Sequence, residues 1–276
     1  MNKQLLNFNH IRLCKMSLEK YIFRIANPAE PIIATAIHAG HEMPCFLLDH
    51  SALTDEERRY EEDPYTDDWA GRFPNHIIVN RSRFEVDLNR SRDKAVYLTP
   101  ADAWGLQVWE HLPPRGTINR LYERYDEFYD DLNCAIRTLT ANNPVVVVLD
   151  LHSYNHRRGG IIAPEEQNPQ VNIGTGTTGN PERWRSIIDC TIDELRNGRI
   201  DETPLDVREN IKFKGGHMAA WLHHRYPESV CVLSIEVKKI FMDELSGVPN
   251  HEVTAAFSDY FQNIKTVLLK MIHEIW

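Results

Sequence analysis

The hydrophobic positions divide the chain into short apolar runs and longer stretches with a helical period. The most apolar run is 145–151, four valines followed by Leu, Asp and Leu, and Pro144 precedes it. Such a run predicts a strand that is buried on both faces, as in the middle of a parallel sheet. Residues 31–37 and 230–238 predict two more strands of this kind, and a carboxylate, Glu236, interrupts the second one.

The helical period is clearest over residues 118–139, where apolar side chains recur every three or four positions. The same spacing predicts helices over 181–197 and 253–276. A helix followed directly by the valine strand is half of a crossover unit, which favours an α/β fold. No repeat, low-complexity tract or Pro/Ser-rich linker divides the chain, so we expect residues 17–276 to form a single domain after a flexible N-terminal extension, 1–16.

Two further segments have weaker patterns. Residues 84–88 alternate apolar and polar side chains, which predicts a strand. Residues 154–179 are rich in Gly, Asn and Thr and predict a long loop. Long loops in compact domains are often functional, so this segment is a candidate border of a site.

Composition narrows the class of protein. The 276 residues are 42% hydrophobic and 26% charged, which is ordinary for a globular protein, and the net charge of −9 argues against nucleic acid as the partner. No apolar run approaches the roughly 20 residues of a membrane span. Five cysteines without a Cys-x-x-Cys pair and the lack of an export signal favour reduced thiols and a cytoplasmic location.

Polar side chains follow three of the predicted strands at their carboxyl ends, where α/β sheets place ligands. They are His38, the pair Asp150 and His152, and Glu236. Two imidazoles, one carboxylate and a fourth position left for water describe a catalytic zinc site, in which a further Glu would accept a proton from that water. The spacing does not identify the third ligand. The acidic loop 61–68 is either a solvated surface or the source of that ligand.

The motifs, taken in order, resemble the N-formylglutamate amidohydrolase family. The matching pieces are residues 37–40, 62–67, 83–90, 150–153, 172–175, 214–216, 235–238 and 241–244. The resemblance implies a three-layer α/β domain, with a mixed, mostly parallel central sheet flanked by helices, similar to zinc carboxypeptidases. It also implies one Zn²⁺ per chain and hydrolysis of the amide bond of a small N-acyl amino acid such as N-formylglutamate. It does not indicate an oligomeric state.

The resemblance also implies a metal site and a catalytic base. His38 and His152 would be zinc ligands, and Asp67 would be the third, with Glu42 and Asp68 as alternatives. Glu236 would be the general base. Asp150 would orient one of the histidines rather than bind the metal.

A substrate-binding group follows from the same resemblance. Asn89 and Arg90 would hold a substrate carboxylate, with Arg83 and His217 as further candidates. An arginine beside an asparagine suits this task, because the guanidinium binds a carboxylate through two hydrogen bonds.

Three departures from the family pattern bear on the substrate more than on the chemistry. Ile37 stands where the family commonly has Pro, Asp63-Pro64-Tyr65 precedes the Thr-Asp pair, and residues 156–158 add a histidine and two arginines. Three alternatives therefore stay open: a peptidase, a cell-wall amidase on the same scaffold, or a non-catalytic binding protein with a lapsed metal site. A nucleotide-binding protein is disfavoured, since no phosphate loop follows any strand.

Overall fold

The computed structural model describes residues 21–158 and 161–276, so the predicted N-terminal extension lies outside the described part. Seven strands form one sheet in the order β1-β3-β2-β4-β9-β5-β8. Their bounds are β1 (Tyr21–Ile25), β2 (Ile32–Ala36), β3 (Asn75–Val79), β4 (Val146–Tyr154), β5 (Val171–Gly174), β8 (Val207–Glu209) and β9 (Val230–Lys238). A separate hairpin pairs β6 (Arg199–Ile200) with β7 (Thr203–Pro204).

Four strand pairs are parallel (β2–β3, β2–β4, β4–β9 and β5–β8), whereas β1–β3 and β5–β9 are antiparallel. The central pair is β4–β9, which stays in register from Val146 opposite Val230 to Tyr154 opposite Lys238. The mixed, mostly parallel sheet of the predicted α/β fold is confirmed.

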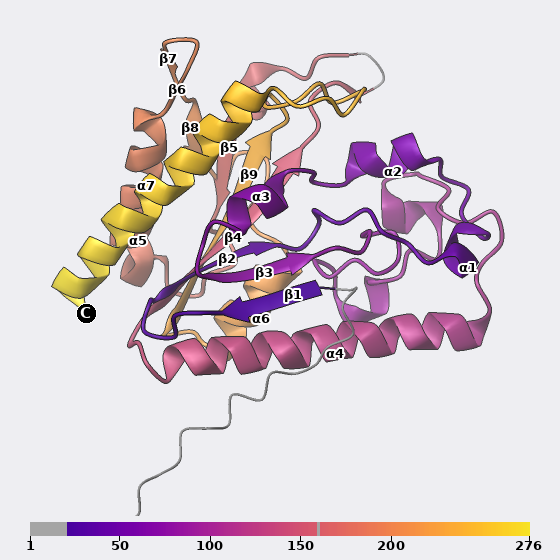
Figure 1. The fold of residues 1–276 in the computed structure, drawn as a ribbon, viewed down its shortest axis with the longest axis horizontal. Helices are drawn as coiled ribbons and strands as arrows, with labels where there is room; N and C mark the ends of the chain where they lie inside the picture. The colour runs from indigo at the N-terminus through magenta and orange to yellow at the C-terminus, as the bar shows by residue number, and fades with distance from the viewer. Residues whose placement is uncertain (1–20, 159–160) are drawn as a thin grey trace, which may run out of the picture.

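Helices cover both faces of the sheet (Figure 1). They are α1 (Cys45–Leu48), α2 (Asp55–Glu61), α3 (Thr66–Ala70), α4 (Arg115–Thr140), α5 (Pro181–Asn197), α6 (His217–Arg225) and α7 (His251–Ile275). Short 3₁₀ turns lie at Arg92–Lys94, Pro100–Ala103 and Glu165–Gln167.

The valine run is continuous because both faces of β4 are covered. Val147, Leu149 and Leu151 pack in the cluster that includes α3, α5 and α7, whereas Val146 and Val148 pack in the cluster that includes α4 and α6. Successive side chains of a strand point to opposite faces. Asp150 and His152 therefore continue the face of Val146 and Val148, beyond the point where apolar side chains fill it.

The predicted strand over 84–88 is wrong. These residues form turns, in which the N–H of Glu85 donates to Ser82 O (2.9 Å) and that of Asp87 to Ala95 O (2.7 Å). Phe84 and Leu88 are buried, but in two different hydrophobic clusters. The alternation thus arises from a turn that lies between two clusters, not from a pleated strand.

The predicted loop over 154–179 is also wrong in part, because it contains β5 (Val171–Gly174). This strand lies between β9 and β8 and is fully buried. It has only four residues and one of them is Asn172, so it leaves no apolar run in the sequence. Its hydrogen bonds come from strands that follow later in the chain.

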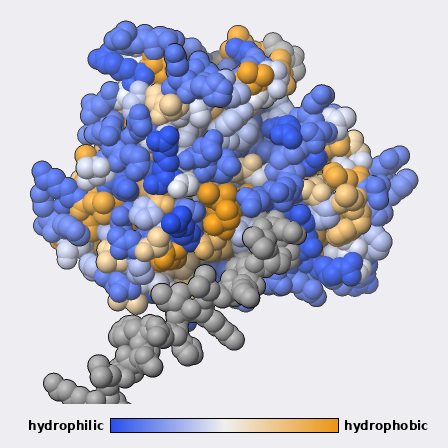
Figure 2. Space-filling view, viewed as in Figure 1, coloured by the Kyte–Doolittle hydropathy of each residue, from blue (hydrophilic) through white to orange (hydrophobic). Residues whose placement is uncertain are grey.

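The face in Figure 2 is largely hydrophilic, with apolar patches scattered between charged side chains. The exposed large apolar residues include Ile161, Ile162, Leu245 and Val248. Within the described part of the chain, no helix has the length and apolar character needed to cross a membrane.

Candidate metal centre

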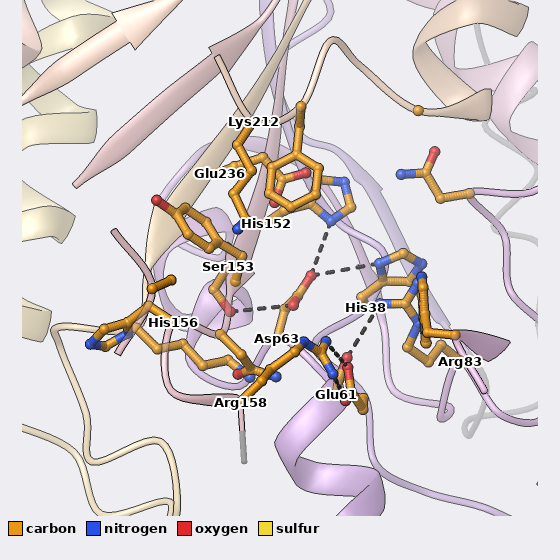
Figure 3. Close-up of a pocket in the computed structure, with 18 of the residues that line it drawn as sticks. His38, Glu61, Asp63, Arg83, His152, Ser153, His156, Arg158, Lys212 and Glu236 are labelled. Carbon is orange, nitrogen blue, oxygen red and sulfur yellow. Dashed lines mark hydrogen bonds and ion pairs between the residues drawn. The ribbon is translucent and has the colours of Figure 1, made fainter. Parts of the chain in front are cut away.

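A pocket of about 810 Å³ opens at the carboxyl ends of the central strands (Figure 3). His38 follows β2, His152 stands near the end of β4, and Glu236 stands opposite His152 on β9. Strand partners in register share a face of the sheet, so His152 and Glu236 both point into the pocket. The three polar strand ends of the sequence therefore meet at one place.

Two imidazoles and one carboxylate form a buried group at the base of the pocket. The candidate ligand atoms of His38, Asp63 and His152 all lie within 4.8 Å of one another. Asp63 Oδ2 is 3.0 Å from His152 Nδ1 and 3.6 Å from His38 Nδ1. The Asp63 carboxylate thus lies between the two rings, whose centroids are 5.0 Å apart (Figure 3).

The outer nitrogen of each ring faces a different buried carboxylate. His38 Nε2 is 2.8 Å from Asp87 Oδ1, and His152 Nε2 is 3.1 Å from Asp150 Oδ1. Asp150 is itself held by the hydroxyl of Thr35, which donates to it over 2.8 Å. A carboxylate behind a histidine fixes the ring and its tautomer in metal sites. This is the position expected of Asp150, although its role stays a prediction.

Burial and neighbouring charges shift the pKa values of Asp63, His152 and Glu236. Burial alone would raise the pKa of Asp63, but hydrogen bonds from His152 and His38 hold it far below its usual range. Burial would lower the pKa of His152, but Asp150 and Asp63 hold it well above its usual range. Burial raises the pKa of Glu236 to about 8; His152 opposes this rise, and Asp63 adds to it.

These observations fit a bound cation. Buried carboxylates are costly unless a positive charge compensates them, and within the described residues Asp63 and Asp150 pair with histidine nitrogens but with no Arg or Lys. Two imidazole nitrogens and one carboxylate oxygen are the donor types of zinc sites that keep a position open.

The structure does not bring Asp67 to the histidines, and Asp63 takes the position predicted for it. Asp63 is tied to the first histidine loop, because its N–H donates to His38 O (2.9 Å). Tyr65 then has a left-handed backbone (φ 70°) and α3 begins at Thr66. Asp67 therefore lies in the first turn of α3, outside the pocket, where an acid favours the helix dipole.

The structure also places the two alternatives for the third ligand away from the pocket. Glu42 and Asp68 are exposed, and neither lines the pocket. The signal that could have identified Asp63 is Pro64. A residue before proline is driven away from helical geometry, so Asp63 belongs to the extended chain that reaches the strand ends.

Asp87 is a site residue that the sequence reasoning missed. It is fully buried, and besides His38 it holds Arg83, whose Nη2 donates to it over 2.7 Å, and the hydroxyl of Tyr97. The two arginines within four residues of Asp87, Arg83 and Arg90, were a signal for a buried ion pair, but the mistaken strand assignment hid it.

Three of the four predicted substrate-binding residues line the pocket: Asn89, Arg90 and Arg83. Gly216 packs directly on Asn89, and a Cβ there would lie 2.2 Å from the Asn89 amide oxygen, so any other residue would displace the Asn89 side chain. His217 does not line the pocket. Its ring lies against Tyr129, with centroids 5.8 Å apart.

Fold and site together define an α/β protein with a buried histidine–carboxylate group at the carboxyl end of a mixed sheet. Residues 30–242 match the family described as N-formylglutamate amidohydrolase. The match spans most of the chain, and the protein belongs to this family, as the motifs predicted. No curated protein sequence matches it.

Solved structures agree on the fold. An N-formylglutamate amidohydrolase from Ralstonia eutropha superimposes with a TM-score of 0.74 at 17% identity, covering 93% of this chain and 99% of that one. A gene product from Agrobacterium tumefaciens superimposes with a TM-score of 0.60 at 14% identity, covering 91% and 96%. At these identities the likeness concerns the fold alone.

Proposed function

We propose that the protein hydrolyses the amide bond of a small N-acyl amino acid of the N-formylglutamate type, with one zinc ion held by His38, Asp63 and His152. The observation that carries this proposal is the orientation of the two rings. Each turns Nδ1 toward Asp63 while a buried carboxylate faces its Nε2. Family membership supports the amide bond as the target.

When bound, the zinc ion supplies Lewis acidity for the amide carbonyl and for the attacking water. The proton transfers in the proposed reaction are carried out by a side chain of the protein. The charge of a bound zinc ion would lower the pKa of Glu236 and keep it ionised. Glu236 then accepts a proton from the water as the water oxygen bonds to the carbonyl carbon, and passes that proton to the amide nitrogen as the C–N bond breaks. The products are a carboxylate, formate for a formyl group, and the free amino acid.

Two arginines have different freedom in this scheme. Arg83 is held by Asp87, so its guanidinium is fixed near the reacting centre, where it can stabilise negative charge on the carbonyl oxygen. Arg90 is 3.9 Å from Asp87 and its guanidinium carbon lies 5.5 Å from the centre of the Trp104 ring. It is thus available to bind the substrate carboxylate, beside Asn89.

The experiment is an amine-release assay with N-formyl-L-glutamate on purified protein. Chelation should abolish release, and stoichiometric zinc should restore it. Glu236→Gln should retain zinc and lose about 10²- to 10⁴-fold in kcat, the usual contribution of a general acid–base group. Glu228→Gln, an exposed carboxylate just before β9, is the matched control. Near-normal turnover by Glu236→Gln would remove Glu236 from the mechanism.

A further inference from the structure

Lys212 is a pocket residue for which the proposed reaction has no use. It belongs to the exposed loop between β8 and α6 and lines the pocket together with Glu236. In the view of Figure 3 it lies on the other side of His152 and Asp63 from His38 and Arg83. The pocket therefore has cationic side chains on both sides of the candidate metal ligands.

The partners of Lys212 differ from those of three other cations that line the pocket, Arg83, Arg158 and Lys239. Arg83 pairs with Asp87, and Arg158 pairs with Glu61 through two hydrogen bonds of 2.7 Å. Lys239 donates to two backbone carbonyl oxygens. These three side chains are already satisfied by oxygen atoms of the protein.

Lys212 Nζ instead has neutral partners. It donates to the amide oxygen of Asn168 and lies 5.0 Å and 5.7 Å from the ring centres of Tyr154 and Phe213. No carboxylate among the described residues lies within ion-pair distance of it. Burial and the charge of Arg158 lower the pKa of Lys212, and the charge of Glu236 partly offsets this lowering. The ammonium group is thus held in position without a countercharge.

We propose that Lys212 binds a second carboxylate of the substrate, so that the site selects N-acyl amino acids with two carboxylates. This inference rests on the proposed function, in which Arg90 binds the first carboxylate. The pocket volume of about 810 Å³ leaves room for both groups. The second carboxylate can come from the side chain of an acidic amino acid or from a dicarboxylic acyl group.

The test compares substrates that differ only in that charge. N-formyl-L-glutamate against N-formyl-L-glutamine probes the side chain, and N-succinyl-L-glutamine against N-butyryl-L-glutamine probes the acyl group. In one of the two pairs, Lys212→Met should lower kcat/KM about 10- to 100-fold for the charged member alone, the value of a charged hydrogen bond. Lys212→Arg should recover part of the lost kcat/KM. Lys270→Met, an exposed lysine on α7, controls for net charge.

A binding measurement separates this inference from the proposed function. Calorimetry on zinc-loaded Glu236→Gln, with and without Lys212→Met, measures affinity for the same four compounds without turnover. Loss of affinity confined to the charged member of a pair supports the role of Lys212 even if the wild-type protein hydrolyses none of them. Equal losses for charged and neutral members, or no loss at all, would overturn it.

Discussion

Two buried histidines beside the same strand show how differently one side chain can be used. His152 on β4 and His223 on α6 are 2% and 5% exposed, and both lie next to β9. His223 Nε2 accepts the N–H of Val232 over 3.0 Å, and its Nδ1 is 3.0 Å from the hydroxyl of Thr177. His152 has carboxylates at both nitrogens instead.

The pKa values of the two rings move in opposite directions. Burial lowers the pKa of His223 to about 4, so the ring is neutral, and neutral groups satisfy both of its nitrogens. β5 ends opposite Ser234 and so does not reach Val232. The ring of His223 supplies the acceptor that the N–H of Val232 would otherwise lack. Carboxylates hold the pKa of His152 well above its usual range against burial. Burial alone therefore does not distinguish the two rings, whereas the carboxylates around His152 do.

The largest effect expected from this comparison is on zinc affinity when the shared carboxylate is removed. Asp63→Asn removes the carboxylate of a proposed direct ligand, so the Kd for zinc should rise by more than the about 100-fold typical of residues that only contact a ligand. Competition with a chromophoric chelator measures it. Asp67→Asn is the matched control and should leave the Kd at the wild-type value, since Asp67 lies outside the pocket. If Asp67→Asn caused the loss, the assignment of Asp63 would be wrong.

A smaller effect on zinc affinity is expected from Asp150, which faces the Nε2 atom of His152. Asp150→Asn keeps the shape of the side chain and an acceptor for Thr35 but removes the charge that faces His152 Nε2. The Kd for zinc should rise about 10- to 100-fold. Asp189→Asn, an exposed acid on α5, is the control. An unchanged Kd for Asp150→Asn would mean that His152 does not need this carboxylate.

The smallest expected effect is that of His223 on the pH dependence of the free energy of unfolding. Its folded pKa of about 4 lies below the ordinary value of 6.5, so the unfolded state binds the extra proton as the pH falls from 6.5 toward 4. The free energy of unfolding should fall by about 1 kcal/mol between pH 7 and pH 5.5 from this residue alone.

Urea unfolding of chelator-treated protein at the two pH values measures this term. The difference between wild type and His223→Gln isolates it, because groups elsewhere titrate in both proteins. A pH dependence that is the same in both would show that His223 is not held neutral in the folded state.

The sequence predicted the parts of the fold in which burial leaves a periodic pattern. β4, β9 and α4 were predictable because each buries a continuous run or a regular stripe. β5 was not, since four residues with a central asparagine leave too short a signal. The turns at 84–88 imitate a strand because two separate clusters bury alternate side chains.

The candidate site was predictable to the same extent. His38, His152 and Glu236 could be found because they end or interrupt apolar strands, and parallel strands bring such ends together. Composition alone does not choose Asp63 from the acidic loop, and Pro64 indicates only that Asp63 is extended. The left-handed backbone of Tyr65 and the hydrogen bond from the Asp63 N–H to His38 O decide which acid turns inward, and both depend on tertiary structure.

Anomalous scattering at the zinc absorption edge, from crystals of zinc-loaded protein, tests the central claim most directly. The account predicts one peak bonded to Nδ1 of His38, Nδ1 of His152 and a carboxylate oxygen of Asp63, with Asp87 and Asp150 still facing the two Nε2 atoms. A peak bonded through Nε2, or no peak between the two rings, would contradict it.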